Sequence, residues 1–387
     1  MSSARVAFPE VAAPATGGTV LVYRDRIVPK SEAQFMRRQY VGFERLKPLW
    51  IGCKTGDGLE ALGAAPLILG GSGSLGAVRR TLFKQLGLVP SVPDIGLLGA
   101  RIVHAQFGRG GALALPIARA LGVPLVVTYH GGDATKNAHY RPRLFPTIYQ
   151  RRLEALKREA ALFICVSEFI RRVLVERGFP AEKLKVIRYG VEIGPWQEPP
   201  PPERPYALFV GRFVEKKGAS FLIQAMRILS ERGRDLGLMM IGDGALAPQL
   251  KKEAEGLPNI EFLGWQENAA ARRVMRSALA LCVPSVTAES GDGEGLPNVI
   301  LEAMAEATPV IGARSAGIAE AVENERTGLL IEPQNPVAIA DALERLIERP
   351  GLRSTMGEAA RIDASQKFDA AAQSHLLEET LLSTLER

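Results

Sequence analysis

Short apolar runs alternate with longer amphipathic stretches over nearly the whole chain. A short, uniformly apolar run is typical of a strand buried on both faces, and the spacing of apolar residues between the runs favours helices. This alternation predicts βα units and a parallel sheet flanked by helices. In the first half of the chain, the predicted strands are Thr19–Tyr23, Pro66–Leu69, Arg101–Ala105, Pro124–Tyr129, Leu162–Val166 and Leu184–Ile187. The predicted helices there are Glu32–Leu46, Ala77–Leu86, Ala112–Leu121, Thr147–Ala161 and Glu168–Arg177.

A proline-rich segment, Ile193–Pro205, interrupts this alternation. Consecutive prolines fit neither a helix interior nor a central strand, so the segment is predicted to be a stiff hinge. A second βα series follows the hinge. Its predicted strands are Tyr206–Val210, Leu236–Ile241, Ile260–Leu263, Leu279–Val283 and Pro309–Ile311, and its predicted helices are Ala219–Gly233, Leu246–Glu255, Asn268–Ser277 and Pro297–Ala305.

The two series predict an α/β protein with two doubly wound, Rossmann-like domains. A length of 387 residues is enough for two separate cores. We place the first domain at residues 1–192, the hinge at 193–205, the second domain at 206–367 and an amphipathic closing helix at 368–387. Because ligands of open α/β sheets bind at the carboxyl ends of the strands, we expect the two domains to face a cleft.

The charge of the chain is mildly basic. Lys and Arg number 48 and Asp and Glu 42, which gives a net charge of +6. This excess suits anionic small molecules or an anionic membrane surface and does not indicate a nucleic-acid partner. Nine basic residues in the first half form either solvated helix faces or a surface for anionic lipid. They are Arg37, Arg38, Arg79, Arg80, Lys84, Arg141, Arg143, Arg151 and Arg152.

The cysteines and the apolar runs bear on the compartment. Cys53, Cys165 and Cys282 are widely spaced and form neither a disulfide framework nor a zinc-binding pattern, so we expect a reducing, cytoplasmic setting. The first residues lack the pattern of a secretory signal, and no apolar run approaches the roughly 18 residues that a membrane helix needs. Any membrane contact, at the inner face of the cell membrane, is therefore expected to be peripheral.

Two glutamates in Ser290–Ala305 are candidates for ligand binding. Glu302 falls on a mostly apolar helix that begins near Pro297, and a carboxylate on a buried helix needs a partner, such as the hydroxyls of a ribose. Glu294 precedes the helix, where free backbone amides can hold a diphosphate. Taken alone, this spacing also fits two glutamates that are solvated or cap an ordinary helix.

A second candidate motif, Val210–Gly218, follows a predicted strand. Arg212 and Lys217 place a guanidinium and an ammonium at the carboxyl end of that strand, where both can bind phosphate. Gly211 allows the backbone to approach a ligand closely. A solvated basic loop is the alternative interpretation.

Two further glycine turns follow predicted strands of the second half. Gly242 and Asp243 belong to one of them, and Gly264 and Trp265 to the other. Each turn taken alone is more typical of a connection between elements. Trp265 is either a core residue or an apolar shelf for a nucleobase.

The order of these motifs resembles that of the retaining, GT-B-fold glycosyltransferases of family 4. The resemblance covers Tyr206–Glu332 and includes the later Thr327–Leu330. It implies transfer of a sugar, with retention of configuration, from a UDP- or GDP-linked donor to an acceptor hydroxyl. The acceptor would be a glycan or a lipid-linked molecule, in the synthesis of bacterial polysaccharide, glycolipid or a related glycoconjugate. It also implies that neither a metal nor a cofactor is needed.

The resemblance assigns roles to individual residues. It implies that Arg212 and Lys217 neutralise the diphosphate, that Glu302 binds the ribose and that Glu294 binds the transferred sugar. In the first half, it implies that His130 lies over that sugar. The remaining donor-binding positions that it implies are Gly211, Gly242, Asp243, Gly264, Gly295, Leu296 and Asn298.

The phosphate-side loop of the first domain is left open. Gly17 and Gly18 precede the first predicted strand, whereas the family carries its glycines after it. Residues 28–35 resemble a variant of that loop, with Ser31 as a cap for the next helix, and we favour Ser31. The family's last helix returns to the first domain, as we expect for residues 368–387.

Three other functions are considered. A sugar-nucleotide epimerase of the same architecture would need further acid and base groups in the cleft. A non-catalytic module that binds nucleotide sugars would not need both glutamates and the basic pair. A dinucleotide-dependent oxidoreductase would need an early glycine fingerprint that opens a helix, and the sequence lacks one there.

Overall fold

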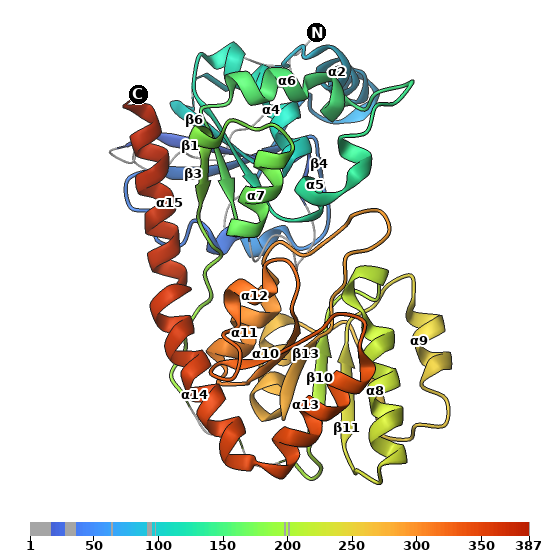
Figure 1. The fold of residues 1–387 in the computed structure, drawn as a ribbon. Helices are drawn as coiled ribbons and strands as arrows, with labels where there is room; N and C mark the ends of the chain where they lie inside the picture. The colour runs from blue at the N-terminus through green and yellow to red at the C-terminus, as the bar shows by residue number, and fades with distance from the viewer. Residues whose placement is uncertain are drawn as a thin grey trace. The chain divides into compact units, whose positions relative to one another are not determined.

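The computed structural model describes residues 17–27, 36–62, 65–90, 95–96, 98–196, 199 and 202–386, without the side chains of residues 60 and 61. Contacts divide the chain into two compact units (Figure 1). The N-terminal unit comprises Met1–Val166, Ile170–Ile187 and Ala371–Arg387, and the C-terminal unit comprises Ser167–Phe169 and Arg188–Ala370. The predicted phosphate-side residue Ser31 lies outside the described residues.

The described part of the N-terminal unit contains a seven-stranded parallel sheet in the order β5-β3-β1-β6-β7-β8-β9. The non-sequential order at β1 is the signature of a doubly wound sheet. The strands are β1 (Thr19–Tyr23), β3 (Lys47–Gly52), β5 (Leu67–Ile68), β6 (Ala100–Gln106), β7 (Leu125–Tyr129), β8 (Leu162–Cys165) and β9 (Leu184–Val186), with β2 (Arg26–Ile27) and β4 (Lys54–Thr55) paired beside it.

Helices cover both faces of this sheet. Val127 of β7 faces α4, where a Cβ on Gly111 would lie 2.7 Å from its side chain, so the glycine permits close packing. The preceding residue, Val126, points to the opposite face of the sheet, where it belongs to the same buried cluster as Leu377 and Leu381 of the closing helix. The helices are α2 (Gly73–Leu86), α4 (Gly108–Leu121), α5 (Gly132–Thr135), α6 (Ile148–Glu159), α7 (Glu168–Glu176) and α15 (Ala370–Leu385), with short 3₁₀ turns η1 (Leu59–Leu62), η2 (Asn137–His139) and η3 (Ala181–Lys183).

The C-terminal unit contains a six-stranded parallel sheet in the order β12-β11-β10-β13-β14-β15. Its strands are β10 (Tyr206–Val210), β11 (Gly237–Ile241), β12 (Ile260–Gly264), β13 (Ala280–Val283), β14 (Val310–Ala313) and β15 (Gly328–Ile331). Its helices are α8 (Ala219–Glu231), α9 (Ala247–Glu253), α10 (Asn268–Ser277), α11 (Asn298–Ala305), α12 (Ile318–Ala321), α13 (Pro336–Glu348) and α14 (Pro350–Lys367), with the 3₁₀ turn η4 (Glu215–Lys217). One face of the sheet is buried against α8 and α13 in an apolar core.

The closing helix α15 packs onto the N-terminal unit (Figure 1). Its buried Glu378 carboxylate accepts backbone N–H bonds from Glu44, Arg45 and Leu46, at 3.0, 2.8 and 2.6 Å. The Ser374 hydroxyl accepts from the backbone N–H of Gly42 at 2.9 Å. A segment near the start of the chain is therefore held by a helix near its end.

This contact explains an error in the sequence prediction. A helix was predicted over Glu32–Leu46, but the described residues 39–46 form turns and bends, and strand β3, which was not predicted, follows directly. The amides of residues 44–46 find their acceptor in Glu378 rather than in a preceding turn of helix. Tertiary contact of this kind overrides local helix preference. Among the described residues, no helix is long and apolar enough to cross a membrane.

Candidate active site

Three glycine turns meet at the carboxyl edge of the C-terminal sheet. The backbone N–H of Gly211, after β10, donates to Ile241 O at 2.9 Å, and that of Gly242, after β11, donates to Gly264 O at 2.8 Å. Gly242 has φ +139°, and a Cβ there would lie 1.9 Å from Gly211 O, so only glycine fits. The predicted positions Gly211, Gly242, Asp243 and Gly264 are therefore brought together.

A loop that follows β13 packs against the basic motif. Gly218 has φ +65°, and a Cβ there would lie 2.0 Å from Pro284 O, which lets η4 approach the end of β13. The backbone N–H of Val286 donates to Lys216 O at 2.9 Å, and Lys216 Nζ pairs with Asp292 at 3.1 Å. Two regions of the sequence that were predicted separately thus form one surface.

The buried ion pair of this surface joins Lys217 to Glu294. Lys217 Nζ lies 2.9 Å from Glu294 Oε1, and the two side chains are only 15% and 10% exposed. Burial would raise the pKa of the Glu294 carboxyl, but the ammonium groups of Lys217 and Lys216 outweigh burial and hold that pKa below its ordinary value. Glu294 is therefore an ionised, buried carboxylate, and the alternative of a solvated cap is wrong.

Glu302 is buried on α11, one turn beyond Asn298, the first residue of the helix. Its Oε1 accepts a hydrogen bond from Asn268 Nδ2, at the start of α10, at 2.8 Å. Directly after α11, the buried Glu306 carboxylate accepts from Arg272 and Arg276 of α10 at 2.6 and 2.7 Å. These bonds fix α11 against α10, and with it the orientation of the Glu302 carboxylate.

The loop before α11 is tightly packed. A Cβ on Gly317 would lie 1.6 Å from Gly295 O, so the chain at Gly295 rests on the start of α12. The neighbouring Leu296 is buried. This packing fixes the backbone on the approach to Asn298.

Other predicted residues of this edge are exposed. Arg212 is exposed and forms no salt bridge within the described part of the chain. Asp243 uses Oδ1 to accept from the backbone N–H of Gly244 at 2.7 Å. Trp265 is 51% exposed, so its interpretation as a core residue is wrong.

In the N-terminal unit, the turn after β7 carries His130. The Asp133 carboxylate holds this turn: Oδ1 accepts from the backbone N–H groups of His130 and Gly131 at 3.0 and 2.8 Å. Oδ2 accepts from the N–H of Gly108, at the start of α4, at 3.0 Å. Burial raises the pKa of Asp133, and these backbone hydrogen bonds offset only part of that increase.

The His130 ring is packed on one face and hydrogen-bonded at one edge. Its centroid lies 4.2 Å from that of Phe107, and the Arg24 guanidinium lies 4.0 Å from the centroid of Phe107. His130 Nε2 lies 2.8 Å from Gln106 Oε1. Burial, followed by the charge of Arg24, lowers the pKa of His130 well below its ordinary value, so the ring is neutral at pH 7.

Known proteins resemble this chain in sequence and in fold. Residues 192–363 match the family described as "Glycosyl transferases group 1", and residues 79–194 match "Glycosyltransferase Family 4". The amylovoran biosynthesis glycosyltransferase AmsK of Erwinia amylovora is 30% identical over 311 residues, which are 74% of this chain and 70% of AmsK. The chain belongs to the group 1 glycosyltransferases.

One further relative and one solved structure also resemble the chain. The alpha-D-kanosaminyltransferase of Streptomyces kanamyceticus is 28% identical over 71% of this chain and 75% of its own length. Among solved structures, Alr3699/HepE of Anabaena, in complex with UDP and glucose, superposes with a TM-score of 0.74. That likeness covers 95% of this chain and 100% of the other at 22% identity. The glycosyltransferase therefore has the GT-B fold, with two Rossmann-like domains, as the sequence predicted.

Several candidate residues of the glycosyltransferase were missed by sequence reasoning. Lys216, Asp292 and Asn268 carry the charge pairs and hydrogen bonds described above, and no motif singles out their contacts. Arg24 and Phe107 lie at the ends of β1 and β6, and nothing in the local sequence marks them. One usable signal existed: His104 and Gln106 are polar residues inside the apolar strand β6, where a buried polar group needs a partner.

Gly17 and Gly18 lie at the amino end of β1, where the Gly17 N–H donates to Arg45 O at 2.9 Å. His130 follows the carboxyl end of β7 in the same parallel sheet. The two glycines are thus at the edge of the sheet opposite to His130.

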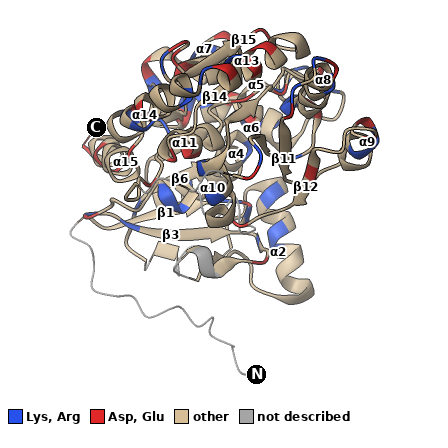
Figure 2. Ribbon diagram, turned by 90° about the horizontal axis from the view of Figure 1, so that it is seen from below, with Lys and Arg blue, Asp and Glu red and all other residues tan. Residues whose placement is uncertain are grey.

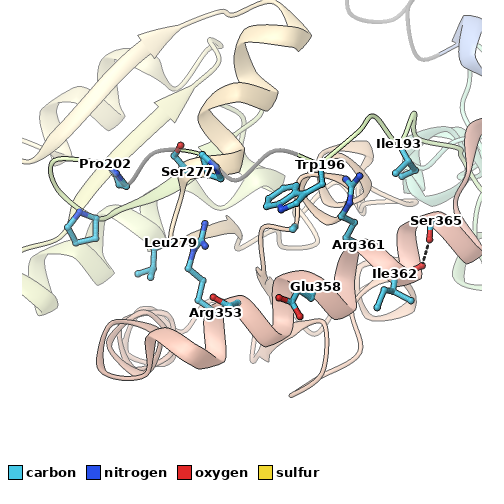
Figure 3. Close-up of a pocket in the computed structure, with 14 residues that line it drawn as sticks. Ile193, Trp196, Pro202, Ser277, Leu279, Arg353, Glu358, Arg361, Ile362 and Ser365 are labelled. Carbon is cyan, nitrogen blue, oxygen red and sulfur yellow. Dashed lines mark hydrogen bonds between the residues drawn. The ribbon is translucent and has the colours of Figure 1, made fainter.

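A cavity of about 950 Å³ also lies in the C-terminal unit (Figure 3). Pro205 and Leu279 line it, and they immediately precede β10 and β13, so it opens at the amino ends of the strands. Arg361 of α14 lies 5.4 Å from the ring centroid of Trp196 there, and Arg353 donates to Ala278 O at 3.0 Å. Since its arginines are held by the protein and it lies away from the carboxyl edge, we do not assign the reaction of the glycosyltransferase to this cavity.

Proposed function

We propose that this glycosyltransferase moves a sugar from a UDP- or GDP-linked donor to an acceptor hydroxyl of a glycan or lipid-linked molecule. The observation that carries the proposal is the carboxyl edge of the C-terminal sheet, where exposed Arg212 and the buried Lys217–Glu294 pair border glycine turns. Structures of HepE hold UDP with glucose and UDP-glucose, which supports a nucleotide sugar as the donor. The name of AmsK, a protein of amylovoran biosynthesis, supports a role in polysaccharide synthesis.

In this proposal, positive charge stabilises the leaving diphosphate. Arg212 presents a guanidinium that forms no salt bridge with described residues, and Lys217 adds an ammonium whose position is fixed by Glu294. Charges that are in place before the reaction stabilise the transition state without a cost of reorganisation. We therefore propose that the reaction needs no metal ion.

The two glutamates would bind the two sugars of the donor. Glu302 would accept hydrogen bonds from the ribose hydroxyls while Asn268 fixes its orientation. Glu294 would accept hydrogen bonds from the transferred sugar, and we propose that His130 contacts that sugar as well. Because Glu294 is already paired with Lys217, we propose retention through front-face attack assisted by the diphosphate, without a covalent glycosyl-enzyme.

We also propose a peripheral contact with anionic lipid through the N-terminal unit. Helix α2 exposes Leu75, Val78, Leu82 and Leu86, which share one stripe because they are three or four residues apart, and the helix contains no acidic residue (Figure 2). The C-terminal end of α2 is joined to the start of α6 by Arg151, which donates to Gln85 at 2.7 Å.

The loop before α6 adds to this surface. Leu144 and Phe145 are 89% and 85% exposed beside the exposed Arg141 and Arg143. Two of the nine basic residues considered for this surface are not available to bind lipid. Arg38 is buried, and Arg152 donates to the backbone carbonyls of Ala112 and Lys84.

Calorimetric titration with UDP, GDP and ADP tests the donor site. Arg212→Ala should weaken binding of the preferred diphosphate by about 1.5–3 kcal/mol, the range for a hydrogen bond to a charged group. Arg204→Ala is the matched control, because Arg204 is a half-exposed arginine that precedes β10 and pairs with Asp235. Equal affinities in both variants would contradict the proposed site.

Product analysis tests the reaction itself. With a donor sugar and a hydroxyl acceptor, NMR of the product should show the anomeric configuration of the donor, and EDTA should leave the rate unchanged. Conversion of the donor sugar to an isomer without an acceptor would identify an epimerase, and binding without turnover of any donor would identify a binding module.

Sedimentation with vesicles tests the lipid contact. The protein should sediment with phosphatidylglycerol vesicles and not with phosphatidylcholine vesicles, and Leu144→Ser with Phe145→Ser should weaken that binding. Ile362→Ser, which changes an exposed apolar residue of the C-terminal unit, is the control. Unchanged sedimentation of the loop variant would exclude this loop from the contact.

A further inference from the structure

A continuous chain of hydrogen bonds leads from His130 into the core of the N-terminal unit. It passes from the His130 ring to Gln106, then to Tyr40, His104 and Thr128, with distances of 2.8, 2.7, 2.8 and 2.7 Å. The four residues behind His130 are buried, and His104 and Gln106 have no exposed surface. Buried polar groups of this kind are costly unless each finds a partner, and here each one does.

The orientation of the Gln106 amide sets the direction of this chain. Gln106 Nε2 donates to the Tyr40 hydroxyl, so Tyr40 must donate its only hydrogen to His104 Nδ1. Burial lowers the pKa of His104 to about 3, so that ring is neutral at pH 7. A neutral ring that accepts at Nδ1 carries its proton on Nε2, and it donates that proton to Thr128 Oγ1.

The same reasoning fixes the proton of His130. The amide of Gln106 uses its nitrogen for Tyr40, so its oxygen faces His130 and accepts from Nε2–H. A chain that ran in the opposite direction would place the protons of both histidines on Nδ1. The two rings, which belong to different strand ends, must therefore hold the same tautomer.

We propose that Gln106 is a positioning residue of the glycosyltransferase, which holds His130 neutral with its proton on Nε2. The proposal rests on the proposed contact between His130 and the transferred sugar. In this state Nε2 is committed to Gln106, and Nδ1 is the acceptor nitrogen of the ring. His130 then serves the sugar as a fixed hydrogen-bonding group and not as a general acid or base.

The surroundings of the ring support a permanently neutral imidazole. Arg24, behind Phe107, is the charged group that disfavours an imidazolium, and His104, in the core, is a titratable group that stays neutral at pH 7. Asp133 is the carboxylate of the same turn, and its oxygens accept from the backbone N–H groups of residues 108, 130 and 131. The bond to Gln106 therefore holds the Nε2 proton of the ring at a fixed acceptor.

The tautomer can be read directly by ¹⁵N NMR of the histidine rings in the full chain. The sequence contains four histidines, and His104→Gln and His130→Gln identify the signals of the two rings in this chain of bonds. We expect both rings to show Nε2–H and an unprotonated Nδ1, unchanged between pH 5.5 and 8. Nδ1–H on His130, or different tautomers on the two rings, would overturn the assignment.

Variants of Gln106 connect the tautomer to turnover. Gln106→Leu keeps the size of the side chain but removes the acceptor, so His130 should lose its single tautomer and kcat should fall about tenfold while the Kd for the nucleotide diphosphate stays the same. Gln106→Glu should place an anion beside Nε2–H and raise the pKa of His130, so that the ring titrates near neutral pH and kcat becomes pH-dependent. Far-ultraviolet circular dichroism and the melting temperature identify any variant that fails to fold.

The outcomes separate this inference from the proposed function. If Gln106→Leu changes the tautomer and leaves kcat at the parent value, Gln106 does not position a group of the reaction, although the transferase activity stands. If the parent shows no transfer to any acceptor, the proposed function fails, while the NMR result still decides the tautomer.

Discussion

Arg212, Lys217 and Glu294 of the C-terminal unit are charged, whereas His130 of the N-terminal unit and the groups bonded behind it are neutral. Arg212 is an exposed guanidinium, and Lys217 pairs with an ionised Glu294 at 2.9 Å. His130, in contrast, ends a chain of buried groups that carry no net charge at pH 7. Full charges suit a diphosphate, whose charge increases as it leaves, whereas neutral groups of fixed orientation suit the hydroxyls of a sugar. Under the proposed function, the charged residues would therefore serve the diphosphate and the neutral residues the transferred sugar.

Breaking the buried ion pair should give the largest effect. Lys217→Ala leaves the Glu294 carboxylate buried without its main partner, which typically costs about 3–5 kcal/mol of unfolding free energy. The double variant Lys217→Met with Glu294→Gln should recover most of that stability but not the turnover. Urea unfolding measures the stability of both variants, and the exposed pair Arg204–Asp235 provides a control whose loss should cost below about 1 kcal/mol. A small stability loss in Lys217→Ala would mean that the pair is not buried in solution.

Replacing one proposed sugar-binding residue in each unit tests whether both units act on the transferred sugar. Glu294→Ala and His130→Ala should lower kcat by about tenfold to a hundredfold, or roughly 1.4–2.7 kcal/mol, and should bind the free nucleotide diphosphate nearly as tightly as the parent. Steady-state kinetics and calorimetry on the same preparations distinguish these effects. Parent-like kcat in both variants would show that neither residue acts on the transferred sugar.

As the pH falls, protonation of the buried histidines in the N-terminal unit should lower the stability of the protein before protonation of Glu294 in the C-terminal unit does. The folded-state pKa values of His104 and His130 are lowered, so the unfolded chain binds protons that the folded chain cannot, and stability falls as the pH drops below about 6.5. Each histidine contributes a slope of up to about 1.4 kcal/mol per pH unit.

The pKa of Glu294 is also lowered, but the stability that it provides is complete above the ordinary pKa of about 4.3 and is lost only below that value. Melting temperatures between pH 7 and 5 should therefore depend less on pH in His104→Gln than in the parent. The exposed His375→Gln should keep the parent slope. Equal slopes in all three proteins would contradict a neutral, buried His104.

The smallest expected effect is on binding of the donor's ribose. Asn268→Ala removes the hydrogen bond that orients Glu302, which is worth about 0.5–1.5 kcal/mol. The KM for the donor should rise about threefold to tenfold, with kcat nearly unchanged. A donor that lacks the ribose hydroxyls should show no such difference between variant and parent, and a difference of equal size there would exclude a role for Asn268 in ribose binding.

The two units also differ in how much of them the sequence could predict. The motifs around Arg212, Gly242 and Glu294 are short stretches at strand ends, and the parallel sheet brings strand ends to one edge. The partners of His130 come instead from residues 40 and 104–107, and their meeting depends on packing between distant segments. Local patterns therefore predicted the charged residues and the βα order, but not Arg24, Phe107 or the bond between Gln106 and His130.

Tertiary packing also explains why a predicted helix boundary was wrong. Helix α4 begins at Gly108, earlier than the predicted Ala112, although its first turn contains glycines with poor helix propensity. A Cβ at Gly108 would lie 2.5 Å from the Tyr129 ring, so the glycine is required by packing against β7. At this position, the low helix propensity of glycine disfavours a helix, whereas packing against β7 requires glycine.

The return of α15 to the N-terminal unit has a consequence for how the protein is made. During synthesis, residues 17–187 leave the ribosome first. Leu377, Glu378 and Leu381, which complete the N-terminal unit, leave it last. Apart from Ser167–Phe169, the C-terminal unit is one continuous segment, Arg188–Ala370, and it can reach its native state before the N-terminal unit does. The half of the enzyme that is translated first is therefore expected to mature second, and nascent chains stalled before residue 370 should expose the amides of residues 44–46 to solvent exchange.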